Sequence, residues 1–86
     1  MDSQKIEDHI RECIIKQYPL VRKRGIRKDE PLLENGILDS IGILDLVGYL
    51  EEEFGIVVDD EDLVPDNFQT IERLVNFVSQ KRNGQR

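Results

Sequence analysis

Apolar side chains recur at helical spacing in three separate segments of this 86-residue chain, which begin near residues 3, 40 and 71. The β-branched run at residues 56–58 is too short to indicate a sheet. We therefore predict an all-α fold, a four-helix bundle with three main helices, one short helix and a long first loop. A chain of this length has room for one core, so residues 1–86 are expected to form a single domain.

The first predicted helix covers residues 3–17. Asp2 or Ser3 can cap its start, and Pro19 ends it. Its apolar stripe consists of Ile6, Ile10, Cys13 and Ile14. Residues 19–38 follow without a sustained period and are expected to form a long loop. Aliphatic residues should anchor this loop across the core: Leu20, Ile26, Leu32, Leu33, Ile37 and Leu38.

The second predicted helix starts at Asp39 or Ser40, either of which can cap it, and stops at Gly55. Its inward stripe consists of Ile43, Leu46, Val47, Leu50 and Phe54, and Ile41 and Leu44 are predicted to widen that stripe near the start. Gly42 and Gly48 each cost roughly 1 kcal/mol of helix propensity relative to Ala, so tertiary packing must stabilise this helix.

The remaining third of the chain predicts a short helix and a final long one. Residues 59–64 suit one helical turn, broken by Pro65, and Phe68 is a predicted core residue. Thr70 can cap the last helix, which is expected to fray from Gln80 onward. Its inward residues are Ile71, Leu74, Val75 and Val78.

Charge is distributed unevenly along the chain, which has a formal net charge of −6. Residues 31–80 contain twelve acidic side chains and one basic one, Arg73. This balance argues against nucleic-acid binding and favours a basic partner. The basic segment at residues 22–28 is interpreted as a solvated loop. The one cysteine cannot form an internal disulfide, so a cytoplasmic, monomeric protein without membrane insertion is expected.

Residues with catalytic or metal-binding chemistry are sparse. His9 is the only histidine, on a charged side of the first helix, and is expected to be solvated. Cys13 lies on the apolar stripe and is predicted to be a core residue. The acidic run at residues 59–62 lacks the glycine and distal glutamate of an EF-hand loop. We therefore predict neither an enzyme nor a metal site.

Ser40 is the one position where local chemistry suggests a function. A helix N-terminus presents free N–H groups and the positive end of the helix dipole, which would stabilise a phosphate ester on this serine. Asp39 beside it can hold a divalent cation or cap the helix. The alternative is that Asp39 and Ser40 are only a cap pair.

The segment LLENGILDSIGILDLVGYLEEEFGI, residues 32–56, resembles the central signature of the acyl carrier protein family. In that family an Asp-Ser pair and an aliphatic residue open the second helix, as Asp39, Ser40 and Ile41 do here. A Leu-Glu-Glu-Glu-Phe-like stretch closes it, as at residues 50–54. Residues 60–78 are similar to the family's third and fourth helices, and the resemblance covers about residues 3–80.

The resemblance implies that a magnesium-dependent phosphopantetheinyl transferase attaches 4′-phosphopantetheine from coenzyme A to Ser40. The arm would carry acyl groups as thioesters from a loading ligase or transferase to downstream synthases with basic docking patches. The residues implied to bind these partners are Ile41, Asp45, Glu51, Glu52 and Glu53. A cargo pocket is conceivable along Leu50, Phe54, Val58, Phe68 and Leu74, with ordinary core packing as the alternative.

Three functions are compatible with this pattern. The first is an acyl carrier for fatty-acid, polyketide or specialised biosynthesis. The second is an aminoacyl or D-alanyl carrier. Residues 65–68 resemble carriers of amino acids or of specialised acyl groups more than the fatty-acid type, and the basic loop at residues 22–28 is also atypical of the fatty-acid type. The third is an unmodified helical module whose acidic face binds a basic partner.

Overall fold

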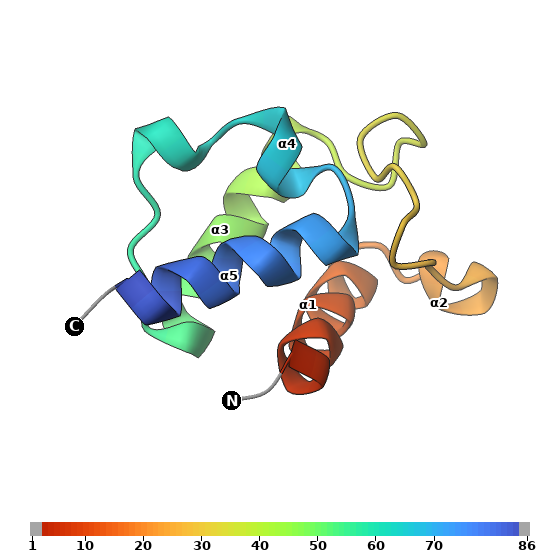
Figure 1. The fold of residues 1–86 in the computed structure, drawn as a ribbon. Coiled ribbons are helices and arrows are strands. Elements are labelled where there is room, and N and C mark those ends of the chain that lie inside the picture. The colour runs from red at the N-terminus through yellow and green to blue at the C-terminus, as the bar shows by residue number, and fades with distance from the viewer. Residues whose placement is uncertain (1–2, 85–86) are drawn as a thin grey trace.

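The computed structural model describes residues 3–84 and is built from helices, which confirms the all-α prediction (Figure 1). No strand occurs within these residues. The helices are α1 (Ser3–Gln17), α2 (Val21–Arg24), α3 (Ser40–Phe54), α4 (Pro65–Phe68) and α5 (Ile71–Gly84), with a 3₁₀ turn, η1 (Asp60–Asp62), before α4.

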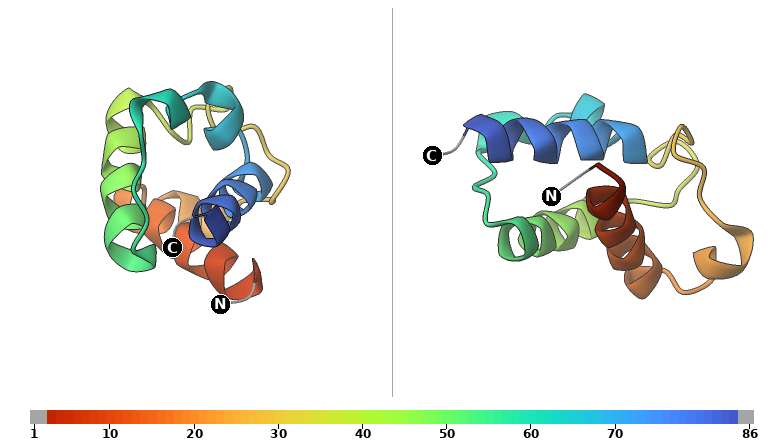
Figure 2. Two further views of the ribbon diagram at one scale, coloured as in Figure 1. Left: turned by 60° about the vertical axis from the view of Figure 1, so that its left-hand side comes forward. Right: turned by 60° about the horizontal axis from the view of Figure 1, so that its bottom comes forward.

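Helix α5 is the central element, because it contacts α1, α3 and α4. Helix α1 also packs against α3, and the one-turn helix α2 lies at the end of the molecule opposite the last turn of α5 (Figure 1 and Figure 2, right). The side chains that fill the centre come from α1, α3, α4, α5 and the loop before α3. The most completely enclosed are Ile6, Ile10, Ile14, Leu32, Leu38, Leu46, Leu50, Phe68, Ile71, Leu74 and Val78.

The predicted bounds of the first two main helices are confirmed. Helix α1 ends at Gln17, and Asp2, one of its two predicted caps, lies outside the described residues. Asp39 is the N-cap of α3. Gly55 ends α3 in the left-handed conformation (φ 64°), and its N–H donates to Glu51 O at 3.0 Å.

The long first loop differs from the prediction at one end. Its first residues form α2, and Leu20 is 86% exposed, so its assignment as a core anchor is wrong. The rest of the loop packs into the core as expected, through buried Ile26, Leu32, Ile37 and Leu38 and partly buried Leu33. The N–H of Leu32 donates to Gln69 O at 2.8 Å, which ties the loop to the turn between α4 and α5.

The predicted widening of the α3 stripe is also wrong. Ile41 and Leu44 are 72% and 64% exposed. The buried row of α3 begins instead at Gly42 and continues through Leu46, Leu50 and Phe54, because the α3 backbone packs closely against α1 at the glycine. Residues 41 and 44 consequently lie on the opposite side of the helix.

The last helix is longer than predicted and stays helical to Gly84. Lys81 Nζ lies 2.6 Å from Asp62 Oδ2 and 3.2 Å from Asp59 Oδ2, and Arg82 Nη1 donates to Phe54 O at 3.2 Å. These tertiary contacts keep the end of α5 helical, although its polar composition predicted that it would fray from Gln80 onward.

The segment between α3 and α5 behaves largely as predicted. η1 forms within the predicted helical turn, Phe68 is buried, and the Thr70 hydroxyl accepts from Arg73 N at 3.1 Å. Pro65 breaks the preceding turn but also begins α4, since its missing N–H costs nothing at the first helical position. Phe77, which the sequence did not single out, packs on Phe68 with ring centroids 5.9 Å apart.

Glu30 in the loop is the buried charged residue of the described chain. Its carboxylate pairs with Arg24 and accepts from Asn35 Nδ2 at 2.9 Å and from Arg27 N at 3.3 Å. Hydrogen bonds from Arg24 and then Asn35 lower the pKa of Glu30 from 4.5 to about 2.

This lowered pKa predicts a loss of stability in acid. Between pH 5 and 2 the unfolded chain binds a proton at Glu30 that the folded chain does not, so the free energy of unfolding falls as pH falls through this window. Urea melts at several pH values should show Glu30→Gln to be less stable than wild type at pH 7. As the pH falls toward 3, the variant should lose less stability than wild type, so the difference between the two should shrink. Asp29→Asn, at an exposed neighbour, is the control and should melt like wild type at pH 7.

Candidate functional site

The first turn of α3 presents Ser40 to solvent. Asp39, in extended conformation, uses Oδ1 to accept the Gly42 N–H at 2.7 Å and so acts as the cap. Ser40 is the first helical residue and is exposed. Within residues 3–84, no hydrogen bond of the structure engages its hydroxyl. Capping is thus done by Asp39, and the Ser40 hydroxyl is left accessible for chemistry.

The end of α1 holds this turn in place. The Tyr18 hydroxyl donates to Asp39 Oδ1 at 3.2 Å, and partial burial together with the negative charge of Asp39 raises the pKa of the phenol. Gln17 Nε2 donates to Gly42 O at 3.4 Å and to Asp45 Oδ2 at 3.2 Å. Sequence reasoning did not find Tyr18 or Gln17. The available signal was a glycine inside a helix, which indicates a close neighbour but does not name it.

Gly42 is required by this contact. A Cβ at position 42 would overlap the Tyr18 hydroxyl and would lie 3.2 Å from both Tyr18 Cζ and Asp39 Oδ1. Gly48, two turns further on, has open space around it. The two glycines of α3 therefore have different roles, since only Gly42 permits the close approach of Tyr18, the residue that follows α1.

The residues of α3 that were predicted to bind partners do not all lie on one exposed side of the helix. Ile41, Asp45 and Glu52 are exposed on the side of α3 that also carries Ser40 and Leu44. We call these five residues the α3 face.

Asp45 of this face also accepts from Gln17 Nε2, and the two other glutamates, Glu51 and Glu53, make intramolecular contacts of their own. Glu51 Oε2 accepts from Val58 N at 2.9 Å, and Glu53 Oε1 lies 2.9 Å from His9 Nδ1. His9 also packs edge-to-face on Phe54, with centroids 5.7 Å apart, so the expectation of a merely solvated histidine is wrong.

Groups suited to catalysis or metal binding do not converge among residues 3–84. Cys13 is buried as predicted, and burial raises its pKa to about 11. Asp59 and Asp62 form a capping box and bind Lys81. No cluster of three or more potential ligands occurs in this part of the chain.

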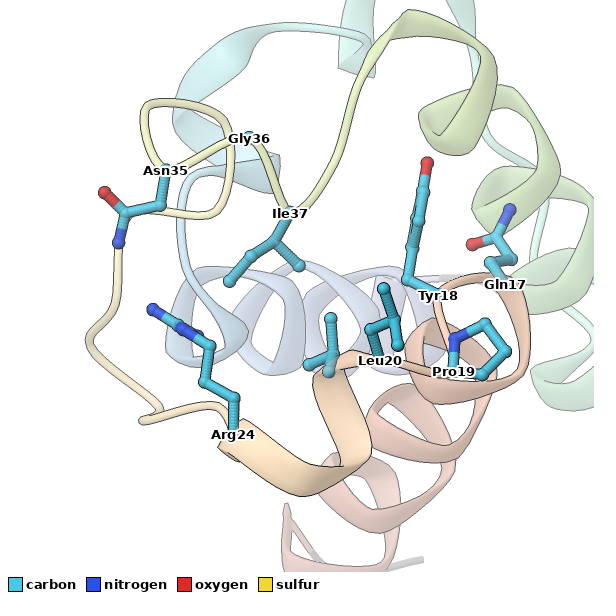
Figure 3. Close-up of a pocket in the computed structure, with 9 residues that line it drawn as sticks. Gln17, Tyr18, Pro19, Leu20, Arg24, Asn35, Gly36 and Ile37 are labelled. Atoms are coloured by element: carbon cyan, nitrogen blue, oxygen red, sulfur yellow. The ribbon is translucent and has the colours of Figure 1, made fainter.

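The residues suggested for a cargo pocket are packed in the core. Leu50, Phe54, Phe68 and Leu74 are at most 5% exposed, and Val58 packs against them. A pocket of about 400 Å³ lies elsewhere, between the end of α1, α2 and residues 35–37 (Figure 3).

The first turn of α3 suits a phosphate ester on Ser40. Its hydroxyl is exposed, the turn itself contains no acidic residue, and its N–H groups form the positive end of a fifteen-residue helix.

A family model described as "Phosphopantetheine attachment site" matches residues 8–78. The chain belongs to the acyl carrier protein family. The carrier is 32% identical to the probable acyl carrier protein PigG of Serratia sp. over 73 residues, which cover 85% of this chain and 84% of that protein. It is 28% identical to an acyl carrier protein of Petrotoga mobilis over 96% of this chain and 94% of the relative. It is 33% identical to a D-alanyl carrier protein of Streptococcus mutans over 64% of this chain and 70% of the relative.

Carriers of this family bind 4′-phosphopantetheine covalently. When bound, the group supplies a terminal thiol that forms thioesters with acyl groups. No helix in the described part of this carrier is long and apolar enough to cross a membrane.

The close approach at Gly42 predicts opposite effects for the same substitution at the two glycines. Gly42→Ala should destabilise the carrier by about 1–3 kcal/mol, because the methyl group collides with Tyr18. Gly48→Ala should stabilise it by up to about 1 kcal/mol through helix propensity. Urea melts measure both. The penalty at Gly42 should shrink when Tyr18→Phe removes the hydroxyl, and an equal penalty in both backgrounds would show that the overlap is not its cause.

Proposed function

We propose that this carrier holds acyl intermediates as thioesters on an arm attached to Ser40 and delivers them to enzymes of fatty-acid, polyketide or specialised biosynthesis. The observation that supports this function best is that two adjacent residues at the start of α3 have separate roles. Asp39 caps the helix, and the exposed Ser40 hydroxyl is left at the positive helix end. The carrier itself performs no catalysis in this proposal, and it acts as a cytoplasmic monomer forming one domain.

The partners in this proposal are a phosphopantetheinyl transferase, an acyl-loading ligase or transferase, and the downstream synthases. The α3 face offers them two exposed aliphatic side chains, Ile41 and Leu44, beside the carboxylates of Asp45 and Glu52. Such a mixed surface gives fast, salt-sensitive encounters with a basic patch. Glu51 and Glu53 belong to the same acidic helix and contribute to its long-range field while making their own intramolecular contacts.

Intact mass spectrometry tests the attachment site. The carrier is incubated with coenzyme A, magnesium and a broad-specificity phosphopantetheinyl transferase. We expect wild type to gain one phosphopantetheine and Ser40→Ala to gain none.

Ser3→Ala is the matched control, because Ser3 is an exposed serine at the start of another long helix. It should be modified like wild type. An unmodified wild-type protein that is shown to be folded, with two unrelated transferases, would favour the unmodified interaction module instead.

Charge reversal tests the α3 face. Glu52→Lys should lower kcat/KM of the transferase by about three- to tenfold at low ionic strength, and the difference should shrink in high salt. Glu61→Lys makes the same charge change on η1, away from α3, and should have a smaller effect. Equal losses in the two variants would indicate that net charge alone matters.

A D-alanyl or aminoacyl carrier is the second candidate. Relatives named D-alanyl carrier protein in Streptococcus sanguinis and Streptococcus mutans are 36% and 33% identical to this chain over 55 residues. Incubating the modified carrier with ATP and an amino-acid ligase, or with ATP and a fatty-acid ligase, distinguishes the two cargo classes by the mass that is added.

A further inference from the structure

Two consecutive residues at the end of α1 hold the two carboxylates that are nearest to Ser40 in the sequence. The Tyr18 hydroxyl donates to Asp39 Oδ1 at 3.2 Å, and Gln17 Nε2 donates to Asp45 Oδ2 at 3.2 Å. Both side chains extend from the end of α1 toward α3 (Figure 3). Asp39 caps the helix, so its contact has a structural role. Asp45 lies inside the helix, where no cap is needed, and its contact requires another explanation.

The Gln17 amide fits this site in one orientation. Its Nε2 also donates to Gly42 O at 3.4 Å, so both groups that it faces are oxygens. A turned amide would place Oε1 against these two acceptors and lose both hydrogen bonds. In the observed orientation Oε1 is buried and has no hydrogen-bond partner among residues 3–84. A buried acceptor without a partner destabilises the folded chain, so stability alone does not explain this side chain.

The contact with Gln17 uses one oxygen of the Asp45 carboxylate. Oδ2 accepts from the amide, whereas Oδ1 makes no hydrogen bond within the described residues. Asp45 is also exposed, as a member of the α3 face. The carboxylate is therefore held in one direction and remains open to a cation on its second oxygen.

A carboxylate held in this way suits an encounter with a basic partner. A side chain that moves freely in solution must be ordered when a partner binds it, and a side chain that is already ordered avoids this loss of entropy. Asp45 follows Ser40 by five residues, about 7.5 Å along the helix axis. A cation paired with Oδ1 would consequently stand close to the hydroxyl that is modified.

We infer that Gln17 is a positioning residue for docking, whose amide holds the Asp45 carboxylate in one orientation on the α3 face for a Lys or Arg side chain of the phosphopantetheinyl transferase. This inference rests on the proposed function. It requires the amide to contribute to partner binding without stabilising the fold, whereas an ordinary hydrogen bond between two helices stabilises the fold and leaves docking unchanged.

Gln17→Met separates partner binding from stability. Methionine has nearly the same length, and it removes the amide together with its unpaired acceptor. In urea melts the variant should be at least as stable as wild type. In transferase assays at low ionic strength its KM should rise about two- to tenfold at unchanged kcat, the effect of losing one ordered side chain. A loss of stability at unchanged KM would show an ordinary packing role and overturn the inference.

Gln4→Met is the matched control. Gln4 Nε2 donates to Asp8 Oδ1 at 3.0 Å, so the same substitution removes the same kind of hydrogen bond, about 20 Å along α1 from Gln17. Its KM should equal that of wild type. An equal rise of KM in the two variants would show that the effect is not specific to the contact with Asp45, contrary to the inference.

A double-mutant cycle tests whether Gln17 acts through Asp45. Asp45→Ala should itself raise the KM of the transferase, and in that background Gln17→Met should cause little further change, because the group that it positions is gone. Additive effects of the two substitutions would assign Gln17 an independent role and overturn the inference.

Side-chain NMR couplings measure the positioning directly. The three-bond couplings from ¹⁵N and ¹³C′ to ¹³Cγ of Asp45 should report one χ1 rotamer in wild type and in Gln4→Met, and averaged rotamers in Gln17→Met. Averaged couplings in wild type would overturn the inference. A folded wild-type carrier that no transferase modifies would contradict the proposed function, whereas normal modification with an unaltered KM in Gln17→Met would contradict only the role of Gln17.

Discussion

The close contact between the end of α1 and the first turn of α3 is the constraint on which the rest of the site depends. Tyr18 lies directly over Gly42 and donates to Asp39, and Asp39 in turn caps α3. This chain of contacts fixes the rotation of α3 about its axis, since the glycine must face α1. With Gly42 inward, Leu46 is buried and Ile41 is exposed. The accessibility of the serine and the composition of the α3 face are consequences of the same contact.

A second set of contacts gives that site a rigid support. Helix α5 packs on α1, α3 and α4, and its basic end reaches back to Phe54 O at the end of α3 through Arg82. Helix α3 is therefore held at both ends, by α1 at its start and by α5 at its finish. In the proposed function the arm on Ser40 meets several enzymes in turn, and a helix fixed at both ends keeps the attachment point in one geometry while docking partners change.

Local signals in the sequence predicted much of this fold. Apolar periodicity, caps and the glycine stop predicted the bounds of α1 and α3, and the prediction of Phe68 as a core residue is confirmed. The errors arose where tertiary contacts decide. The end of α5 is held by residues that precede it by about twenty positions, and Tyr18 meets Asp39 across 21 residues. The identity of an apolar residue such as Ile41 does not by itself show whether its side chain is exposed or buried in the core.

The burial of Cys13 has a practical meaning for work on loaded carriers. It is the chain's single cysteine, is 6% exposed, and burial raises its pKa to about 11, so at neutral pH it is almost entirely a protonated thiol. A thiol at the end of a phosphopantetheine arm on the exposed Ser40 would lie outside the packed core that encloses Cys13. Maleimide reagents would therefore label the arm and spare the polypeptide, which makes the unaltered chain its own probe for fluorescence or spin labelling.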